Sequence, residues 1–146
     1  TAILTLIEKQ KLIAEGAGAT PVAAALFDKL PIKGKKTVCV VSGGNIDVNI
    51  LSRVITRGQV TSGRRADLVI ALQDRPGQLR EVSEIVSSCG ANVVGVQHNR
   101  SDADMDITGC FLRLELETRD AEQINEISAK LTKAGFTLID KNAAHY

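Results

Sequence analysis

Residues 110–118, Cys-Phe-Leu-Arg-Leu-Glu-Leu-Glu-Thr, decide the fold of the second half of the chain. Leucine recurs at every second position, and Arg113, Glu115 and Glu117 occupy the positions between. Since successive side chains of a strand point to opposite faces of its sheet, this alternation predicts a strand with one buried face and one polar face. An antiparallel sheet with helices on one side produces that pattern.

The segments around this strand predict an α+β domain of β-α-β-β-α-β order. We expect strands over 67–72, 92–98, 110–118 and 137–140, and helices over 75–88 and 121–133. The two helices carry apolar side chains at helical spacing, among them Val82, Ile85, Val86, Ile127 and Leu131. This order is the split βαβ, or ferredoxin-like, arrangement.

The first 65 residues predict a different, α/β pattern. We expect a helix over 2–14, and a second helix that Thr20 caps, that Pro21 begins and that ends near Leu30. The continuous apolar run at 36–41 predicts a strand buried on both faces, as in parallel sheets. A glycine turn at 42–45, a helix over 46–57 and a linker over 58–65 complete this part.

The charge distribution also divides the chain in two. Residues 1–65 hold ten basic and four acidic side chains, a net charge of +6, whereas residues 66–146 hold eight and thirteen, a net charge of −5. The basic residues are spread along the expected helices without a nucleic-acid-binding motif. We therefore expect domains at 1–65 and 66–146, and no nucleic-acid partner.

Composition excludes several classes of protein. Aromatic residues make up 3% of the chain, too few for a stacking platform for nucleic acid bases. No run approaches the ~20 apolar residues that cross a bilayer, and residues 1–15 do not form a signal peptide, so we expect no membrane association and a cytoplasmic location. Cys39, Cys89 and Cys110 lie in apolar runs without CxxC spacing, which predicts buried thiols.

We expect no metal site from sequence spacing. The acidic segment 99–106 lacks the turn glycine and the closing glutamate of a calcium-binding loop, so a solvated hairpin loop is the expectation.

The first glycine-centred motif is Ser42-Gly43-Gly44-Asn45, between the apolar run and a helix. On spacing alone, it is either a tight turn or a place where backbone N–H groups meet a ligand. Residues 12–57 are similar to the end of the catalytic domain of threonine ammonia-lyases and related serine/threonine dehydratases and serine racemases, fold-type II enzymes that use pyridoxal 5'-phosphate (PLP). The resemblance implies that Ser42 hydrogen-bonds the pyridine nitrogen of PLP and that Gly43 and Gly44 form the cofactor turn.

The resemblance to this family also implicates Glu15, in a Glu-Gly-Ala-Gly-Ala turn, at the edge of the cofactor site; otherwise it is a solvated residue at a helix end. The family's Schiff-base lysine motif and its phosphate-binding run of glycines do not occur in these 146 residues. Lys33, Lys35 and Lys36 surround Gly34 without that context. We therefore expect no catalytic residue in this chain, no bound PLP and no activity from the chain alone.

The second motif is Asp74-Arg75-Pro76-Gly77-Gln78-Leu79. Asp74 is expected to cap the following helix, Pro76 to lie in its first turn and Gly77 to let a ligand approach the backbone. The helix N-terminus suits a carboxylate, although a plain turn would show the same residue types.

Together with residues 90–100, this motif makes segment 66–142 resemble an ACT domain. The resemblance implies an amino-acid effector bound where two such domains pair, hence a homo-oligomer. The implied effector-binding residues are Asp74, Arg75, Pro76, Gly77, Gln78, Leu79, Asn92 and Val93. His98 is either a ligand contact or a surface residue at the end of a strand.

The two resemblances together predict the C-terminal regulatory part of a threonine ammonia-lyase, which converts L-threonine to 2-oxobutanoate and ammonia in isoleucine biosynthesis or threonine catabolism. Two alternatives stay open. One is a self-standing amino-acid-binding regulatory protein without catalysis, and the other is a non-catalytic module whose glycine turn binds a phosphate ligand.

Overall fold

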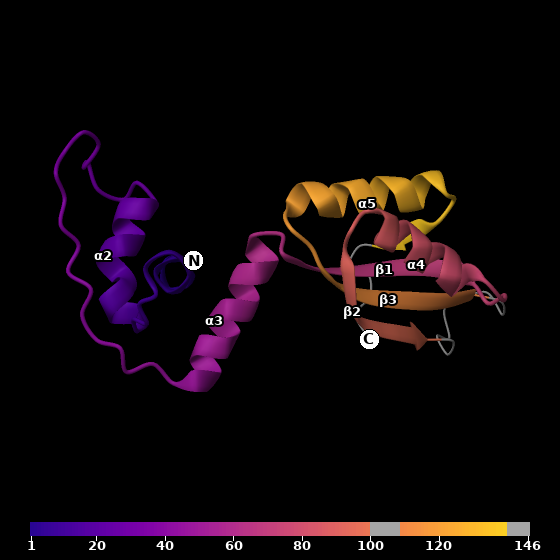
Figure 1. The fold of residues 1–146 in the computed structure, drawn as a ribbon, viewed down its shortest axis with the longest axis horizontal. Helices are drawn as coiled ribbons and strands as arrows, with labels where there is room; N and C mark the ends of the chain where they lie inside the picture. Colours follow the sequence, from indigo (N-terminus) through magenta and orange to yellow (C-terminus); the bar gives the residue numbers. More distant parts are fainter. Residues whose placement is uncertain (100–108, 140–146) are drawn as a thin grey trace. The chain divides into compact units, whose positions relative to one another are not determined.

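The computed structural model describes residues 1–99 and 109–139. The chain divides into two compact units, Thr1–Gly58 and Gln59–Tyr146, and each is described by itself (Figure 1).

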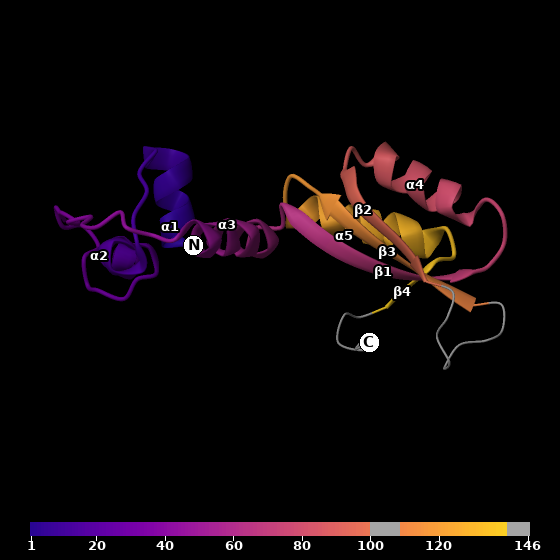
Figure 2. The same cartoon turned by 90° about the horizontal axis from the view of Figure 1, so that it is seen from below.

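The second unit is a four-stranded antiparallel sheet with two helices on one face (Figures 1 and 2). Its strands are β1 (Arg65–Gln73), β2 (Asn92–Asn99), β3 (Gly109–Glu117) and β4 (Thr137–Ile139), in the order β2-β3-β1-β4. The helices are α4 (Gln78–Ser88) and α5 (Ala121–Lys133). The predicted β-α-β-β-α-β order is confirmed.

The core lies between the sheet and the two helices. Leu112, Leu114 and Leu116 are fully buried on β3, as the alternation predicted. They pack with side chains from β1, α4 and α5, namely Ile70, Leu72, Val82, Val86, Ile127 and Leu131. Burial stabilises each such side chain by about 1.5–3 kcal/mol relative to exposure, so this aliphatic cluster is the main source of stability. Gln123 of α5 is also buried, at 2% exposure, which the apolar pattern did not predict.

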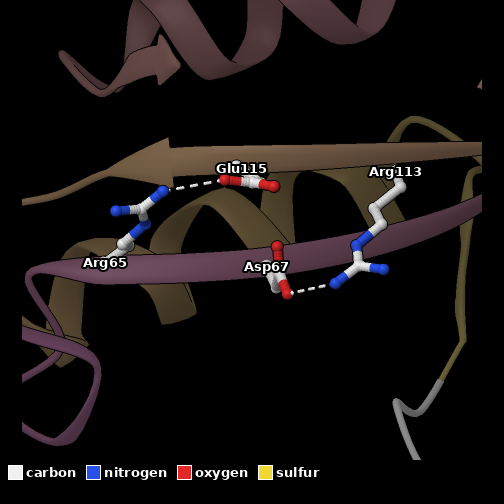
Figure 3. A network of polar contacts seen from close by, with 4 residues as sticks. All are labelled: Arg65, Asp67, Arg113 and Glu115. Atoms are coloured by element: carbon white, nitrogen blue, oxygen red, sulfur yellow. Dashed lines mark hydrogen bonds and ion pairs between the residues drawn. The ribbon is translucent and has the colours of Figure 1, made fainter. Parts of the chain in front are cut away.

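The other face of the sheet carries two cross-strand ion pairs (Figure 3). Asp67 of β1 lies directly opposite Glu115 of β3, a pairing of like charges that destabilises a sheet. Arg65 Nη2 lies 2.8 Å from Glu115 Oε2, and Arg113 Nη2 lies 2.8 Å from Asp67 Oδ2. The hydrogen bond and the charge of Asp67 raise the pKa of Arg113. The two guanidinium groups thus neutralise the facing carboxylates.

The first unit is helical. It contains α1 (Ala2–Thr5), the π-helix η1 (Leu6–Gln10), α2 (Gly16–Leu26) and most of α3 (Val48–Thr61). The first helix ends at Gln10 instead of reaching Ala14, because Lys11 takes a left-handed conformation with φ of +58°. The small core contains Ala2, Leu6, Ala14 and Ala19.

The predicted start of α2 is wrong. The helix begins at Gly16, Glu15 is its N-cap, and Pro21 lies inside it. Thr20 therefore does not cap the helix; its hydroxyl donates to the Gly16 carbonyl at 3.0 Å, one helical turn earlier. The small residues 16–19 allow this earlier start, and the helix ends at Leu26, before the predicted Leu30.

The predicted buried strand at 36–41 is also wrong. The segment is not paired with any strand in the part of the chain that the structure describes, and Val38 and Val40 are 90% and 71% exposed. A parallel strand needs neighbours on both edges to bond its backbone groups, and none lies beside these residues in the described ranges. The first unit therefore has an extended segment where the apolar run predicted a strand.

Helix α3 is longer than predicted and crosses the boundary between the units. It begins after Asp47, whose Oδ1 accepts from the backbone N–H of Asn49 at 2.8 Å, and it continues through Gly58 to Thr61. The first half of the predicted linker, residues 58–61, is therefore helix. Gly58 is buried, and the side chain of Leu4 occupies the space that a Cβ would need there.

A short, well-bonded connection joins α3 to β1. Thr118 Oγ1 donates to the Gly63 carbonyl at 2.6 Å, and the Thr118 N–H donates to the Arg64 carbonyl at 3.0 Å. Gly63 has φ of +69°, and the backbone of Ala121 fills the place of a Cβ. Residues 62–64 are thus held, within the second unit, against the residues that join β3 to α5.

The remaining expectations have mixed outcomes. Cys89 and Cys110 are buried as predicted, but Cys39 is only half-buried, because the segment around it does not join a sheet. Apart from Asn99 in β2, the segment discussed for calcium lies outside the described residues. Within the described ranges, none of the helices combines the length and apolar character that a bilayer-crossing segment needs.

Candidate functional site

The loop from β1 to α4 contains the second glycine motif. Gly77 is the N-cap of α4, with φ of +98°, and no atom lies within 4 Å of the place where its Cβ would be. Asp74 and Pro76 precede the helix, so the predictions that Asp74 caps it and that Pro76 lies in its first turn are wrong. The left-handed turn at Gly77 makes the helix start later than the sequence pattern indicated.

The side chain of Gln78 holds the two ends of this loop together. Its Oε1 accepts from the backbone N–H of Gln73 at 3.1 Å, and the residue is 8% exposed. The Arg75 N–H donates to the Gln73 carbonyl at 2.8 Å, which tightens the same turn. Gln78 also lines a cavity at this loop, so its contact with an effector stays a prediction, and its side-chain oxygen bonds the loop backbone.

A cavity of about 300 Å³ lies at this loop, lined by residues 72–79 and by His98. All six residues of the second motif line it. Its volume is at the lower end of the range for small-molecule sites, which suits a ligand of amino-acid size. The first turn of α4 presents backbone N–H groups and the positive end of the helix dipole beside it. These features favour an anionic group such as a carboxylate.

The other two predicted effector residues lie elsewhere in the same chain. Asn92 and Val93 pair with Glu117 and Leu116 at the start of β2, whereas His98 lies near its end. Asn92 Nδ2 donates to Glu117 Oε2 at 3.2 Å. Neither residue lines the cavity, so a single chain does not bring all eight predicted residues together.

Three residues with metal-ligand side chains meet beside the cavity. His98 Nε2 lies 3.2 Å from Cys110 Sγ, and the ligand atoms of Asp74, His98 and Cys110 all lie within 4.8 Å of one another. His98 pairs with Leu112 across β2 and β3, so Cys110 is its diagonal neighbour on the same face. Sequence spacing missed this cluster because three separate segments supply it. The signal available was the β-α-β-β-α-β order, because β3 runs antiparallel to β1 and β2, so its start lies beside their ends.

The first glycine motif and Glu15 lie together in the first unit. The Glu15 N–H donates to the Gly43 carbonyl at 3.1 Å, and Gly43 has φ of +76° with the Glu15 carboxylate in the place of a Cβ. A Cβ on Gly18 would overlap the carbonyl of Ser42, and one on Gly44 would lie 3.2 Å from the Ile13 carbonyl. The structure thus brings Glu15 against the turn that contains Ser42, Gly43 and Gly44.

This turn fits only part of a PLP site. It offers the hydroxyl of Ser42, which is exposed, the Glu15 carboxylate and backbone groups. These suit one edge of a cofactor ring, but they provide neither an amine that forms an imine nor a set of donors around a phosphate. Lys33, Lys35 and Lys36 are exposed residues of a separate turn around Gly34.

Comparison with known protein families agrees with the fold of the second unit. The profile of the ACT domain matches residues 61–134, which include all of β1, β2, β3, α4 and α5. The chain belongs to the ACT-domain family. The cavity at residues 72–79 therefore lies at the β1–α4 loop of an ACT domain.

Known relatives extend the similarity beyond the ACT domain. The chain is 49% identical to an L-threonine ammonia-lyase of Thermotoga maritima over 135 residues, which is 92% of this chain and 33% of that protein. It is 41% identical to the L-threonine ammonia-lyase of Geobacter sulfurreducens over 139 residues (95% and 34%), and 31% identical to the biosynthetic L-threonine dehydratase of Halalkalibacterium halodurans over 144 residues (97% and 34%). The chain thus resembles the C-terminal regulatory part of such enzymes and spans about a third of their length.

Proposed function

We propose that the ACT domain binds a free amino acid and regulates a PLP-dependent L-threonine ammonia-lyase of which this chain is the C-terminal part. The parent enzyme converts L-threonine to 2-oxobutanoate and ammonia in the cytoplasm. The similarity to L-threonine ammonia-lyases over more than nine-tenths of this chain supports the enzyme class. The cavity at the N-terminus of α4 is the observation that carries the binding role.

The chemistry of the cavity supports an amino-acid ligand. A carboxylate placed near Gly77 meets the first N–H groups of α4 and the positive end of the helix, which stabilise negative charge. Leu72, Leu79 and Pro76 supply apolar wall, and Asp74 is an acidic side chain at the same cavity that suits an ammonium group. An α-amino acid carries these three kinds of group at the required short spacing.

Pairing of two copies explains why the remaining predicted residues lie far from the cavity. β2 is an edge strand, and Val94 and Val96 on it are 44% and 50% exposed. Edge strands of this kind pair readily with another chain. Antiparallel pairing of two β2 strands about a two-fold axis near Gly95 brings Asn92 and Val93 of a second copy beside the His98 end of the first. The effector site then lies at the interface and uses all eight residues.

Calorimetry on the 146-residue chain with L-threonine, L-serine, L-isoleucine, L-valine and L-leucine, with a metal chelator present, tests the binding role. We expect heat of binding from at least one of them. Gly77→Asn and Gly77→Asp both place a side chain of the same shape in open space at a left-handed position, where Asn is among the better tolerated residues. Since only Asp adds negative charge at the carboxylate site, we expect Asp to abolish binding and Asn to weaken it less. Equal affinities for both variants and the parent chain would place the ligand elsewhere.

The interface is tested by Val96→Lys, which adds a charge to the exposed edge strand without touching the cavity lining. We expect sedimentation equilibrium to show a dimer for the parent chain and a monomer for the variant, with amino-acid binding lost in the monomer. A monomeric variant that binds with unchanged affinity would show that one chain makes the whole site.

The glycine turn at Ser42 contributes, in this proposal, one edge of the PLP site of the complete enzyme, with Gly43, Gly44 and Glu15 around it. PLP supplies an electron sink for loss of the β-hydroxyl when it is bound. The chain alone, mixed with PLP and L-threonine, should release no 2-oxobutanoate, because the turn offers no amine or phosphate site. Measurable product would contradict the proposal that this chain does not catalyse the reaction alone.

A further inference from the structure

The cluster of Asp74, His98 and Cys110 combines a carboxylate, an imidazole and a thiol at one point of the ACT domain. The thiol of Cys110 is fully buried, whereas Asp74 and His98 are exposed, so the cluster opens toward solvent on one side only. His98 also lines the cavity at the β1–α4 loop, as does Asp74. A group held by these three side chains would therefore face the cavity.

The types of ligand restrict which cation this cluster can hold. Magnesium and calcium prefer oxygen ligands throughout, while a thiolate together with an imidazole selects zinc or a neighbouring first-row transition metal. Zinc bonds of about 2.3 Å to sulfur and 2.0–2.1 Å to nitrogen, at a tetrahedral angle, place the two ligand atoms about 3.6 Å apart. The separation between His98 Nε2 and Cys110 Sγ is 3.2 Å. The three ligand atoms lie within 4.8 Å of one another, and because His98 and Asp74 are both exposed, rotation of their side chains can adjust these separations to the required geometry.

We propose that Asp74, His98 and Cys110 bind a divalent transition metal ion of the zinc class. The metal displaces the proton of the Cys110 thiol, which passes to solvent or buffer, and the thiolate becomes its softest ligand. Three protein ligands leave a fourth position of the tetrahedron open, which is the arrangement of zinc sites that accept an exogenous ligand. That position faces the cavity. The metal site goes beyond amino-acid sensing and does not depend on it.

A hydrogen bond between His98 and Cys110 without any metal function is the competing explanation for the short contact. It requires only two of the three residues. The two explanations differ in a measurable way, because only the metal site predicts saturable binding of one ion per chain.

Cobalt(II) is the probe, since its complexes with thiolates are coloured whereas zinc is not visible. Titration of the reduced 146-residue chain with Co²⁺, without amino acid, should give a thiolate-to-cobalt charge-transfer band and tetrahedral ligand-field bands that saturate at one equivalent. Addition of Zn²⁺ should bleach both. Loss of a supporting group around a metal ligand costs 10–100-fold in affinity, so loss of a direct ligand should cost at least about 100-fold.

The variants His98→Gln, Asp74→Asn and Cys110→Ser should each show that loss, and Cys110→Ser should also lose the charge-transfer band. Cys89→Ser is the matched control, because Cys89 is another buried thiol of the same core and lies outside the cluster. It should keep the full spectrum. If Cys110→Ser fails to fold, the exposed position His98 still decides the question. Absence of a saturable cobalt spectrum, or a spectrum unchanged by His98→Gln, would overturn the proposal.

Discussion

Gln123 provides the sharpest test of how the ACT domain is held together. Its Oε1 accepts from the Arg119 N–H at 2.7 Å, and its Nε2 donates to the Cys89 carbonyl at 2.6 Å. One buried side chain thus joins the start of α5 to the end of α4. Gln123→Met keeps the length of the side chain but removes both bonds. A buried polar group left without its partner costs about 1–3 kcal/mol, and two such groups are affected.

We expect Gln123→Met to lower the free energy of unfolding by about 2–4 kcal/mol, because water can reach the exposed Arg119 and recover part of the loss. That is a large fraction of the roughly 5–15 kcal/mol that stabilises a domain. Urea denaturation monitored by far-ultraviolet circular dichroism measures this loss of stability. The variant should unfold at a lower urea concentration, with an unchanged dependence of the free energy on urea.

Gln97→Met is the matched control for this experiment. Gln97 is exposed on β2, so the same chemical change should alter stability by less than about 0.5 kcal/mol. If Gln123→Met lowers the free energy of unfolding by no more than the control does, the two short hydrogen bonds make no net contribution to stability. The reasoning about this residue would then be wrong.

Three further predictions concern the core and the surface charges. Leu114→Ala, at a fully buried site, should cost about 2–5 kcal/mol in the same denaturation assay. A double-mutant cycle on Asp67 and Arg113 should give a coupling below about 1 kcal/mol, since the arginine side chain is about half exposed. The hydrogen bond and charge of Lys130 lower the pKa of Glu126, so this pair stabilises the fold above the unfolded carboxyl pKa and loses that contribution as the pH falls through the lowered folded value. Titration by nuclear magnetic resonance should show the Glu126 pKa rising toward its ordinary value in Lys130→Met.

The fold of the ACT domain was predictable because its signals are local. Leu112, Leu114 and Leu116 alternate with charged residues, and that alternation follows from the geometry of a single strand. The first unit was less predictable, because residues 36–41 need strands on either side before an apolar run can become a buried strand. The start of α2 depended on small residues that permit helix as readily as turn. Thr20 and Pro21 therefore indicated a start that was later than the observed one at Gly16.

The candidate site was likewise predictable only where its sequence signals are local. The loop at residues 74–79 was predictable because glycine and proline next to a helix carry a local signal. The role of Gln78 was not, since its partner is a backbone N–H whose position depends on the closed loop. The meeting of Asp74, His98 and Cys110 depends on the register of three strands, which no spacing along the chain reveals.

The direct connection from α3 to the sheet has a mechanical consequence. Helix α3 runs to Thr61, and only three residues separate it from β1, two of which Thr118 bonds in place. Within the second unit, the backbone of these residues has little freedom to twist, because two carbonyls are bonded and the backbone of Ala121 leaves no room for a Cβ on Gly63. Insertion of glycine residues at 62–64 should therefore loosen the end of α3 from β1 while the sheet and its two helices stay folded.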